Sequence, residues 1–286
     1  MEEAGLDPVE DAPKNFDEFT EVSKTLVREL NPDDTLETIA WDPWQMAGPP
    51  ALIYFTLGKD CKTVSADHTE SMLDQECAVN TAKRFDNYIQ EVYGPYGGYE
   101  ALIRWYADVA GVETGAAQVQ GFIKSQQAFY VSGSWTIGQV NQGNPDMNFS
   151  ILPVPGFEGP QGSVSKHGWS YAIAQDTKHP EAAFDFLKFI TLDPEGNGWF
   201  CKQQRRPCPI ASVNDDDVYG QMGKMWENLM TSMRRDIYPE ASSVDQDTLK
   251  PWIRDFPSRR VAGESVESIM EDLDQQYQSY LDDLNE

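Results

Sequence analysis

Apolar residues recur at helical spacing over two long stretches in the first third of the chain. In residues 16–30 they fall on one face of a helix: Phe16, Phe19, Val22, Leu26 and Leu30. Asn15 precedes this stretch as a helix N-cap, and Glu18 three residues later completes a capping-box arrangement. The same spacing returns in residues 78–92, with an apolar face of Ala82, Phe85, Tyr88, Ile89 and Val92. Both stretches are predicted to be amphipathic helices.

Shorter apolar runs bounded by turn residues predict strands. Residues 36–40 form one such run, and residues 51–57 form another after the Gly-Pro-Pro break at 48–50. Residues 171–174 read Tyr-Ala-Ile-Ala, which is short, apolar and partly alternating, so a buried strand is expected there. A terminal helix is predicted over residues 265–284.

A further helix is predicted to begin at Pro180, because the missing N–H of proline is not needed in the first turn. Glu181 places a negative charge near the positive end of the helix dipole. Apolar residues form a broad stripe along this helix: Ala183, Phe184, Phe186, Leu187, Phe189 and Ile190. A stripe of this width predicts a helix that is mostly buried in a complete domain.

Charge and composition exclude several classes of partner. The chain has 286 residues, 40% of them hydrophobic, which is enough to bury a core. Its formal charge of −25 argues against nucleic acid or an anionic membrane surface, since both attract clustered Lys and Arg. No apolar run approaches the roughly 20 residues needed to span a bilayer. The opening MEEAGLDPVEDAPK lacks the basic and apolar pattern of an export signal.

Signals of catalysis are weak. Ser170 lies in a sequence one residue away from a G-x-S-x-G nucleophile elbow, but that motif needs a strand before the serine, and here the predicted strand follows it. Phosphate-binding loops, HExxH and EF-hand patterns are absent. The acidic run at residues 215–217 is typical of a solvated turn. An enzyme is therefore not expected, and no cofactor is implied.

Residues 168–189 carry a family resemblance. Gly168, Trp169, Ala172 and Ile173, followed by K-x-P-E-A-A-x-x-F-x-x-F from Lys178 onward, resemble the second crossover of family 1 extracellular solute-binding proteins. These are the maltose-binding-protein-like receptors of ABC sugar importers. The family has G-G-W here, and this chain has histidine in place of the first glycine.

Three other segments resemble the same family in the family's order. The sequence A-G-L-D-P with P-K-N-F-D-E-F at residues 4–19 departs from the family pattern at Asn15 and Phe16, where Thr and Trp are usual. The sequence Y-G-G-Y-E-A-L at residues 96–102 matches one branch of the family. In residues 122–135 four positions match the family pattern: Phe122, Ala128, Gly133 and Trp135. Ser125 and Phe129 depart from it.

Tryptophan is the informative residue type for a sugar receptor. Sugars present flat C–H faces and a rim of hydroxyls, which suit broad aromatic plates beside hydrogen-bonding side chains. Five tryptophans stand beside glycine or proline or in expected loops: Trp41, Trp44, Trp135, Trp169 and Trp252. An arbitrary tryptophan is more often a core residue. The resemblance implies, however, that Trp135 and Trp169 face the cleft between two lobes, and Asp42 and Arg254 are candidate hydrogen-bonding partners of the ligand.

The cysteines permit disulfides in a chain that resembles an exported receptor. There are four of them, which allow three pairings: Cys61, Cys77, Cys201 and Cys208. Proximity in the sequence favours Cys61 with Cys77 and Cys201 with Cys208. A zinc site is not expected, because no CxxC motif occurs and the three histidines are scattered.

The resemblance implies an α/β, class II periplasmic-binding-protein-like fold in which the chain supplies the C-terminal lobe and a small part of the N-terminal lobe. Residues 1–172 and 223–286 would form the C-terminal lobe, and residues 173–222 would belong to the N-terminal lobe. Because the main sheet of that second lobe is missing from the sequence, the phenylalanines of the helix at 180–190 are expected to be exposed. The chain alone is expected to bind sugar weakly or not at all.

The implied function is capture of a mono- or oligosaccharide and its delivery to the permease subunits of an ABC transporter. The implied location is periplasmic or extracellular, associated with the membrane as a lipoprotein. The alternative is a stand-alone carbohydrate-recognition or surface-adhesion module, and a glycan-cleaving enzyme ranks third.

Overall fold

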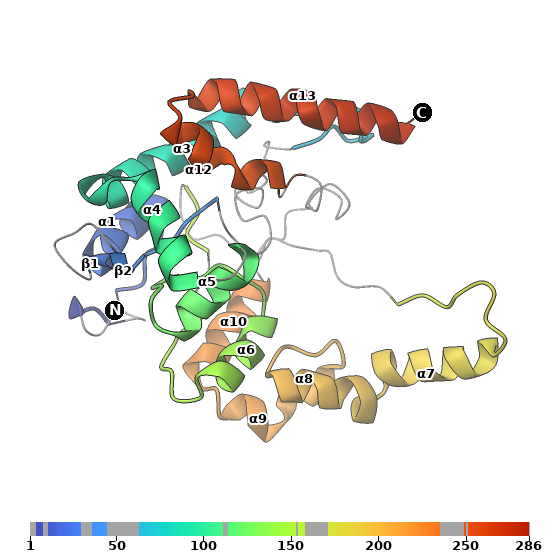
Figure 1. Cartoon of the computed structure of the whole chain (residues 1–286). Helices are drawn as coiled ribbons and strands as arrows, with labels where there is room; N and C mark the ends of the chain where they lie inside the picture. The colour runs from blue at the N-terminus through green and yellow to red at the C-terminus, as the bar shows by residue number, and fades with distance from the viewer. Residues whose placement is uncertain are drawn as a thin grey trace.

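The computed structural model describes residues 4–7, 11–29, 36–44, 63–110, 114–152, 154–157, 171–234, 249 and 251–285. Within them the chain is mostly helical (Figure 1). The α-helices are α1 (Phe16–Leu26), α3 (Glu76–Tyr93), α4 (Tyr99–Trp105), α5 (Thr114–Ile123), α6 (Trp135–Gly143), α7 (Pro180–Leu192), α8 (Trp199–Gln204), α9 (Asp217–Gly220), α10 (Lys224–Arg234), α12 (Phe256–Val261) and α13 (Val266–Asn285). Short 3₁₀ and π segments are η2 (Gly94–Tyr96), η3 (Tyr106–Ala110), η4 (Pro194–Gly198) and η5 (Ala211–Asp215).

The first helix begins where its cap predicts. The Asn15 side chain accepts a hydrogen bond of 2.8 Å from the backbone N–H of Glu18, and the Glu18 carboxylate accepts one of 2.9 Å from the Lys14 N–H. Phe16, Phe19 and Leu26 are buried, and α1 ends at Leu26. Leu30, expected on the same face, lies outside the described residues.

One core joins the two ends of the chain. The buried face of α3 packs against α1 on one side and α13 on the other, and its members include the predicted Ala82, Phe85, Tyr88, Ile89 and Val92. α13 contributes Ile269, Met270, Leu273, Tyr277 and Leu281, which confirms the predicted terminal helix. Figure 1 shows α13 running along one side of the molecule, with α12 folding back beneath it.

Strand pairing in the described residues is short. β1 (Arg28–Glu29) pairs antiparallel with β2 (Leu36–Thr38), with Arg28 opposite Thr38 and a register irregularity between Arg28 and Glu29. The run at 36–40 is thus confirmed as extended chain, and Ile39 continues it by bridging Gln127 in parallel. The predicted strand at residues 51–57 lies outside the described residues.

The region around α7 differs from the buried strand and buried helix that the sequence predicts. Residues 171–174 are exposed and pair with no strand in the described part of the chain. α7 forms where Pro180 predicts, but none of its residues is buried, and it projects away from the other helices (Figure 1). The spacing of apolar residues predicted the helix correctly. Burial of its apolar face also requires a surface to pack on, and the described residues do not provide one. The expectation of exposed phenylalanines is confirmed, since Phe186 is 63% exposed.

Candidate functional site

Two extended segments, residues 39–40 and 126–129, run side by side. Predicted site residues follow each segment in the sequence. The Ile39 N–H donates to the Gln126 carbonyl at 3.0 Å, and the Ala128 N–H donates to the Ile39 carbonyl at 2.9 Å. The Phe129 N–H then donates to the Ala40 carbonyl at 2.9 Å. Because this pairing is parallel, the residues that follow each segment emerge at the same edge. Ligands of α/β folds bind at the carboxyl ends of parallel strands, so this edge is the candidate site.

Trp135 follows the second of these segments, six residues after Phe129 along the chain. It is the first residue of α6, and 49% of its surface is exposed. Its indole ring lies directly over Gly133, because a Cβ at position 133 would overlap the six-membered part of the ring. One face of the indole is therefore supported by backbone, while much of the rest remains open to a ligand. This agrees with the expectation that Trp135 is only partly exposed.

Hydroxyl-bearing residues precede and follow Trp135 in the sequence, and sequence reasoning did not select them. The Thr136 hydroxyl donates to the Ser132 hydroxyl at 2.8 Å. Ser132 directly precedes Gly133, and Thr136 directly follows Trp135. Burial raises the pKa of Tyr130, and a hydrogen bond with Ser132 opposes that rise. The signal was present in the run Y-V-S-G-S-W-T, where hydroxyl-bearing residues alternate around the glycine. Such groups can donate and accept hydrogen bonds with a polyhydroxylated ligand.

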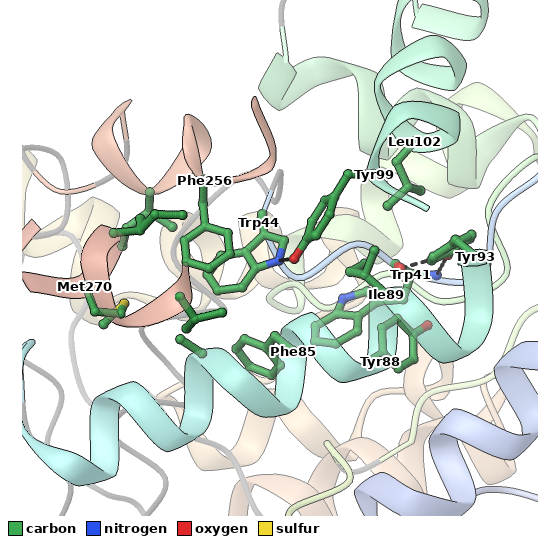
Figure 2. Packing of buried hydrophobic residues seen from close by; sticks show 14 of the residues in the cluster. Trp41, Trp44, Phe85, Tyr88, Ile89, Tyr93, Tyr99, Leu102, Phe256 and Met270 are labelled. Atoms are coloured by element: carbon green, nitrogen blue, oxygen red, sulfur yellow. Dashed lines mark hydrogen bonds between the residues drawn. The ribbon is translucent and has the colours of Figure 1, made fainter. Parts of the chain in front are cut away.

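Trp41 and Trp44, two of the predicted ligand-binding tryptophans, are residues of the main core. Trp41 is fully buried and makes edge contacts with the rings of Phe16, Phe19, Phe85 and Tyr88. Trp44 is 2% exposed, and its Nε1–H donates to the Tyr99 hydroxyl at 3.2 Å (Figure 2). Neither indole offers a face on which a sugar could stack. Aromatic neighbours from α1, α3 and α12 have taken both faces.

The remaining predicted ligand residues are Asp42, Trp252, Arg254 and Trp169. Asp42 is 1% exposed, and its carboxylate accepts a hydrogen bond of 2.9 Å from the Trp44 N–H, so it serves the backbone of its own loop. Its assignment as a sugar contact stays a prediction. Trp252 is half-buried against the main core, and Arg254 is also half-buried. Trp169 lies outside the described residues, so its shared concavity with Trp135 stays a prediction.

The cysteines divide into two kinds. Cys77 is disulfide-bonded, and Cys61, its predicted partner, lies outside the described residues. Cys201 and Cys208 are buried free thiols, so the structure holds the second predicted pair unbonded. The Cys201 thiol donates to the Asn197 side-chain oxygen at 3.2 Å.

Other site types find no support in the described part of the chain. It contains no group of three His, Cys, Asp or Glu residues able to hold a metal, and no helix there is long and apolar enough to cross a membrane. A hollow of about 480 Å³ lies beside the start of α1, lined by Leu6, Asp11, Asp17, Glu18 and neighbouring residues. It has no aromatic side chain, and carboxylates dominate its polar lining. Trp135 therefore fits a sugar better than this hollow does.

Comparison with known proteins places this geometry in a family. Residues 1–230 match the family described as bacterial extracellular solute-binding proteins, whereas no curated protein matches the chain. Among solved structures, CpMnBP1 with mannotriose bound is 19% identical, with a TM-score of 0.73 over 96% of this chain and 68% of that one.

Two further structures have comparable similarity. The sugar-binding protein MalE from Xanthomonas citri is 17% identical, with a TM-score of 0.71 over 99% of this chain and 67% of its own. An ABC-transporter solute-binding protein from Thermotoga lettingae, bound with alpha-D-tagatose, is 14% identical, with a TM-score of 0.71 over 98% and 67%. This chain thus spans about two thirds of their length, and at such identity the likeness establishes the class II periplasmic-binding-protein fold. The chain belongs to the bacterial extracellular solute-binding protein family.

Proposed function

We propose that this protein captures a mono- or oligosaccharide outside the cytoplasmic membrane and delivers it to the permease subunits of an ABC importer. The observation that carries the proposal is the half-exposed Trp135 indole, held on Gly133 in the chain that follows the second of two parallel segments. The structural neighbours with bound mannotriose or tagatose support a sugar as the ligand class.

In this proposal the indole of Trp135 lies against the apolar C–H face of a sugar ring. Ser132 and Thr136 flank residues 133–135, and a hydrogen bond joins their hydroxyl groups. Both hydroxyl groups can also form hydrogen bonds with hydroxyl groups of the ligand. Binding is reversible and involves no chemistry on the ligand, as a transport receptor requires. Trp169 would complete the aromatic surface.

We also propose that the chain contributes to two lobes. The main core draws all its residues from 16–157 and 249–281. A second, smaller core contains Cys201, Cys208, Val213 and Tyr219. This separation supports the assignment of residues 1–172 to one lobe and 173–222 to another, whereas Trp226, from the segment 223–286 proposed for the first lobe, packs against the smaller core. The exposed stripe of α7 would then be the surface that packs on the rest of the second lobe.

Calorimetric titration with a sugar panel tests the function. The panel holds mannotriose, maltotriose and tagatose, and it is applied both to the 286-residue chain and to a longer chain in which a first lobe precedes it. We expect weak binding by the 286-residue chain and much tighter binding of one panel member by the two-lobe protein, because closure of two lobes removes the sugar from water.

Three results separate the proposal from its rivals. Tight binding by the 286-residue chain alone would favour a stand-alone recognition module. Release of shorter sugars from an oligosaccharide during incubation would favour an enzyme. Failure of both proteins to bind any sugar while remaining folded would remove the proposal. Trp199→Ala is the matched control for Trp135→Ala, since Trp199 is 58% exposed on α8, an exposure comparable with that of Trp135.

A further inference from the structure

The chain that follows α6 forms a turn and an irregular segment anchored on α5. The Met147 N–H donates to the Asn144 carbonyl at 3.1 Å, which closes the turn. The Asn144 side-chain N–H donates to the Ile123 carbonyl at 2.9 Å, so the turn is held against the last residue of α5. Further on, the ring of Phe149 makes an edge contact with the ring of Phe122, with centroids 6.4 Å apart. Two contacts with α5 therefore hold this segment in place.

The residues between these two anchors meet solvent. Asp146 and Asn148 are exposed, whereas Met147 and Phe149 are half-buried. Ser150, which follows Phe149, is also half-buried. None of the five lies in a helix or a strand. Asn148 is thus presented to solvent by a surface segment of irregular backbone.

This segment also carries a chemical motif. Asn148 is the one asparagine of the 286-residue chain that has serine or threonine two residues later. The sequence Asn148-Phe149-Ser150 is the N-x-S acceptor pattern for N-linked glycans, and its middle residue is not the excluded proline. Such acceptors belong in surface loops of exported proteins, because the asparagine has to enter the active site of a transferase. An irregular surface segment can enter without the unwinding of a helix or the opening of a sheet.

We propose that Asn148 is an acceptor for N-linked glycosylation on the outer side of the cytoplasmic membrane, the side on which this protein is proposed to act. The donor is an oligosaccharide joined to a polyprenyl lipid through a pyrophosphate. The side-chain nitrogen of Asn148 forms a bond to the anomeric carbon of the first sugar, and the bond from that carbon to the pyrophosphate oxygen breaks. The lipid pyrophosphate leaves with the electron pair of that bond, and one amide proton passes to a base of the transferase.

The surroundings of Asn148 suit this reaction. Asp146, two residues before the acceptor, is exposed and provides a charge that a basic pocket of the transferase can bind. The acceptor also lies beyond the far end of α6 from Trp135, which begins that helix. From Trp135 to Gly143 the helix rises by about 12 Å, at 1.5 Å per residue. The glycan and the proposed transported sugar are therefore assigned to opposite ends of α6.

Enzymatic transfer to the folded protein tests the proposal. The purified 286-residue chain is incubated with a detergent-solubilised bacterial oligosaccharyltransferase and its lipid-linked oligosaccharide, and is then digested with trypsin. Residues 125–166 form one tryptic peptide, because the stretch between Lys124 and Lys166 contains no lysine or arginine. This peptide should gain the mass of one oligosaccharide, and its fragmentation should place the sugar on Asn148.

Variants separate the motif from its placement. Asn148→Gln and Ser150→Ala should abolish the transfer, whereas Ser150→Thr should retain it, and circular dichroism should show the same helical signal in all three. The matched control is Met230→Thr in an Asn148→Gln chain, which creates the acceptor pattern at Asn228, within α10. This control should accept no sugar, because an asparagine within a helix cannot enter the transferase without unwinding.

Three results overturn the proposal. If the native chain stays unmodified while a synthetic peptide of residues 142–152 is modified in the same reaction, the fold withholds Asn148. If neither is modified, the sequence is not an acceptor. If the acceptor in α10 is modified as fast as Asn148, the exposed irregular segment gives no advantage. Sugar capture enters none of these measurements, so the proposed function is tested separately.

Discussion

The indole of Trp44 stacks face to face on the ring of Phe256, with centroids 3.7 Å apart and planes 8° from parallel (Figure 2). Phe256 begins α12, so this stack joins the first part of the chain to its last part. Trp44→Ala should destabilise the fold by about 3–5 kcal/mol, because it removes a buried aromatic side chain and leaves a cavity. Urea unfolding of the variant measures the loss.

Trp199→Ala provides the comparison for this prediction, since it removes an indole that is 58% exposed. Its change in unfolding free energy should stay within about 0.5 kcal/mol. Equal losses for the two variants would contradict the assignment of Trp44 to the core.

Asp86 and Arg260 join α3 to α12 through a two-point ion pair. The Nε and one terminal nitrogen of Arg260 donate to the two Asp86 oxygens at 2.8 and 3.1 Å, and the Tyr99 hydroxyl donates to Asp86 at 3.0 Å. Asp86→Ala should cost about 2–3 kcal/mol, because the Arg260 guanidinium is left poorly compensated in a partly buried place. The double variant Asp86→Leu with Arg260→Met should cost less than the single change.

The matched pair for that experiment is Lys83 with Glu267, 2.7 Å apart and largely exposed. Lys83→Met should change the unfolding free energy by less than about 1 kcal/mol, because exposed ion pairs contribute little. If the double variant loses as much unfolding free energy as the two single variants combined, Asp86 and Arg260 do not stabilise each other.

Buried tyrosines make the fold sensitive to high pH. Burial raises the pKa of Tyr88, Tyr93 and Tyr99 in the folded chain, and for Tyr99 the nearby Asp86 carboxylate adds to the rise. A raised folded-state pKa gives stability that is fully present below the unfolded pKa of about 10 and is lost as pH rises above it. Unfolding free energy should therefore fall above about pH 10.

Tyr88→Phe tests the alkaline effect, because it removes one of these protons together with the hydrogen bond to Ser23. Above about pH 10 the unfolding free energy of the variant should fall less steeply with pH, because one titrating group fewer contributes to the slope. Tyrosinate absorbance should report these groups only as the chain unfolds. Full ionisation of all tyrosines in a chain that keeps its helical signal would contradict their burial.

Local features of this fold could be predicted from the sequence. The start of α1 follows from Asn15 and Glu18, and that of α7 follows from Pro180, because caps and first turns involve residues three or four positions apart. The long periodic faces of α3 and α13 were predictable for the same reason.

Burial could not be predicted in the same way, because it depends on partners far away in the sequence. Trp44 stands beside Pro43 in an expected loop, yet Phe256 covers it from more than 200 positions later. Likewise, the irregular stretch after Cys61 is held by α13, where Asp274 accepts from the Leu73 N–H at 2.9 Å and Gln278 accepts from the Ser71 N–H at 2.8 Å. Trp135 could be recognised because the glycine two residues before it is a local signal.

Trp135 should contribute to sugar affinity while contributing little to stability. In a two-lobe protein, Trp135→Ala should weaken sugar binding by about 1–3 kcal/mol, the range expected for lost apolar burial. Gly133→Ala should also weaken binding, because the added methyl group would displace the indole from its support. Calorimetric titration measures both. Unchanged affinity in both variants, with the fold intact, would remove Trp135 from the site.

The last prediction concerns α7, whose apolar residues have no cover in the described structure. Phe184, Phe186 and Phe189 are 55%, 63% and 46% exposed. An apolar stripe of this kind favours self-association, so replacing all three by serine should make the 286-residue chain more monomeric in sedimentation velocity. Its unfolding free energy should change little, because no buried contact is lost.

The same triple change should have the opposite effect in a protein that contains the whole second lobe. There the three rings would be packed, and their loss should lower the unfolding free energy by several kcal/mol, as deletion of buried aromatic side chains does. A large loss in the two-lobe protein with little change in the 286-residue chain would show that α7 packs on the second lobe. An apolar surface exposed to solvent in both proteins would give little change in either. If the triple variant destabilises the 286-residue chain as strongly as the two-lobe protein, α7 already packs within this chain, and its stripe is not the surface for the remaining lobe.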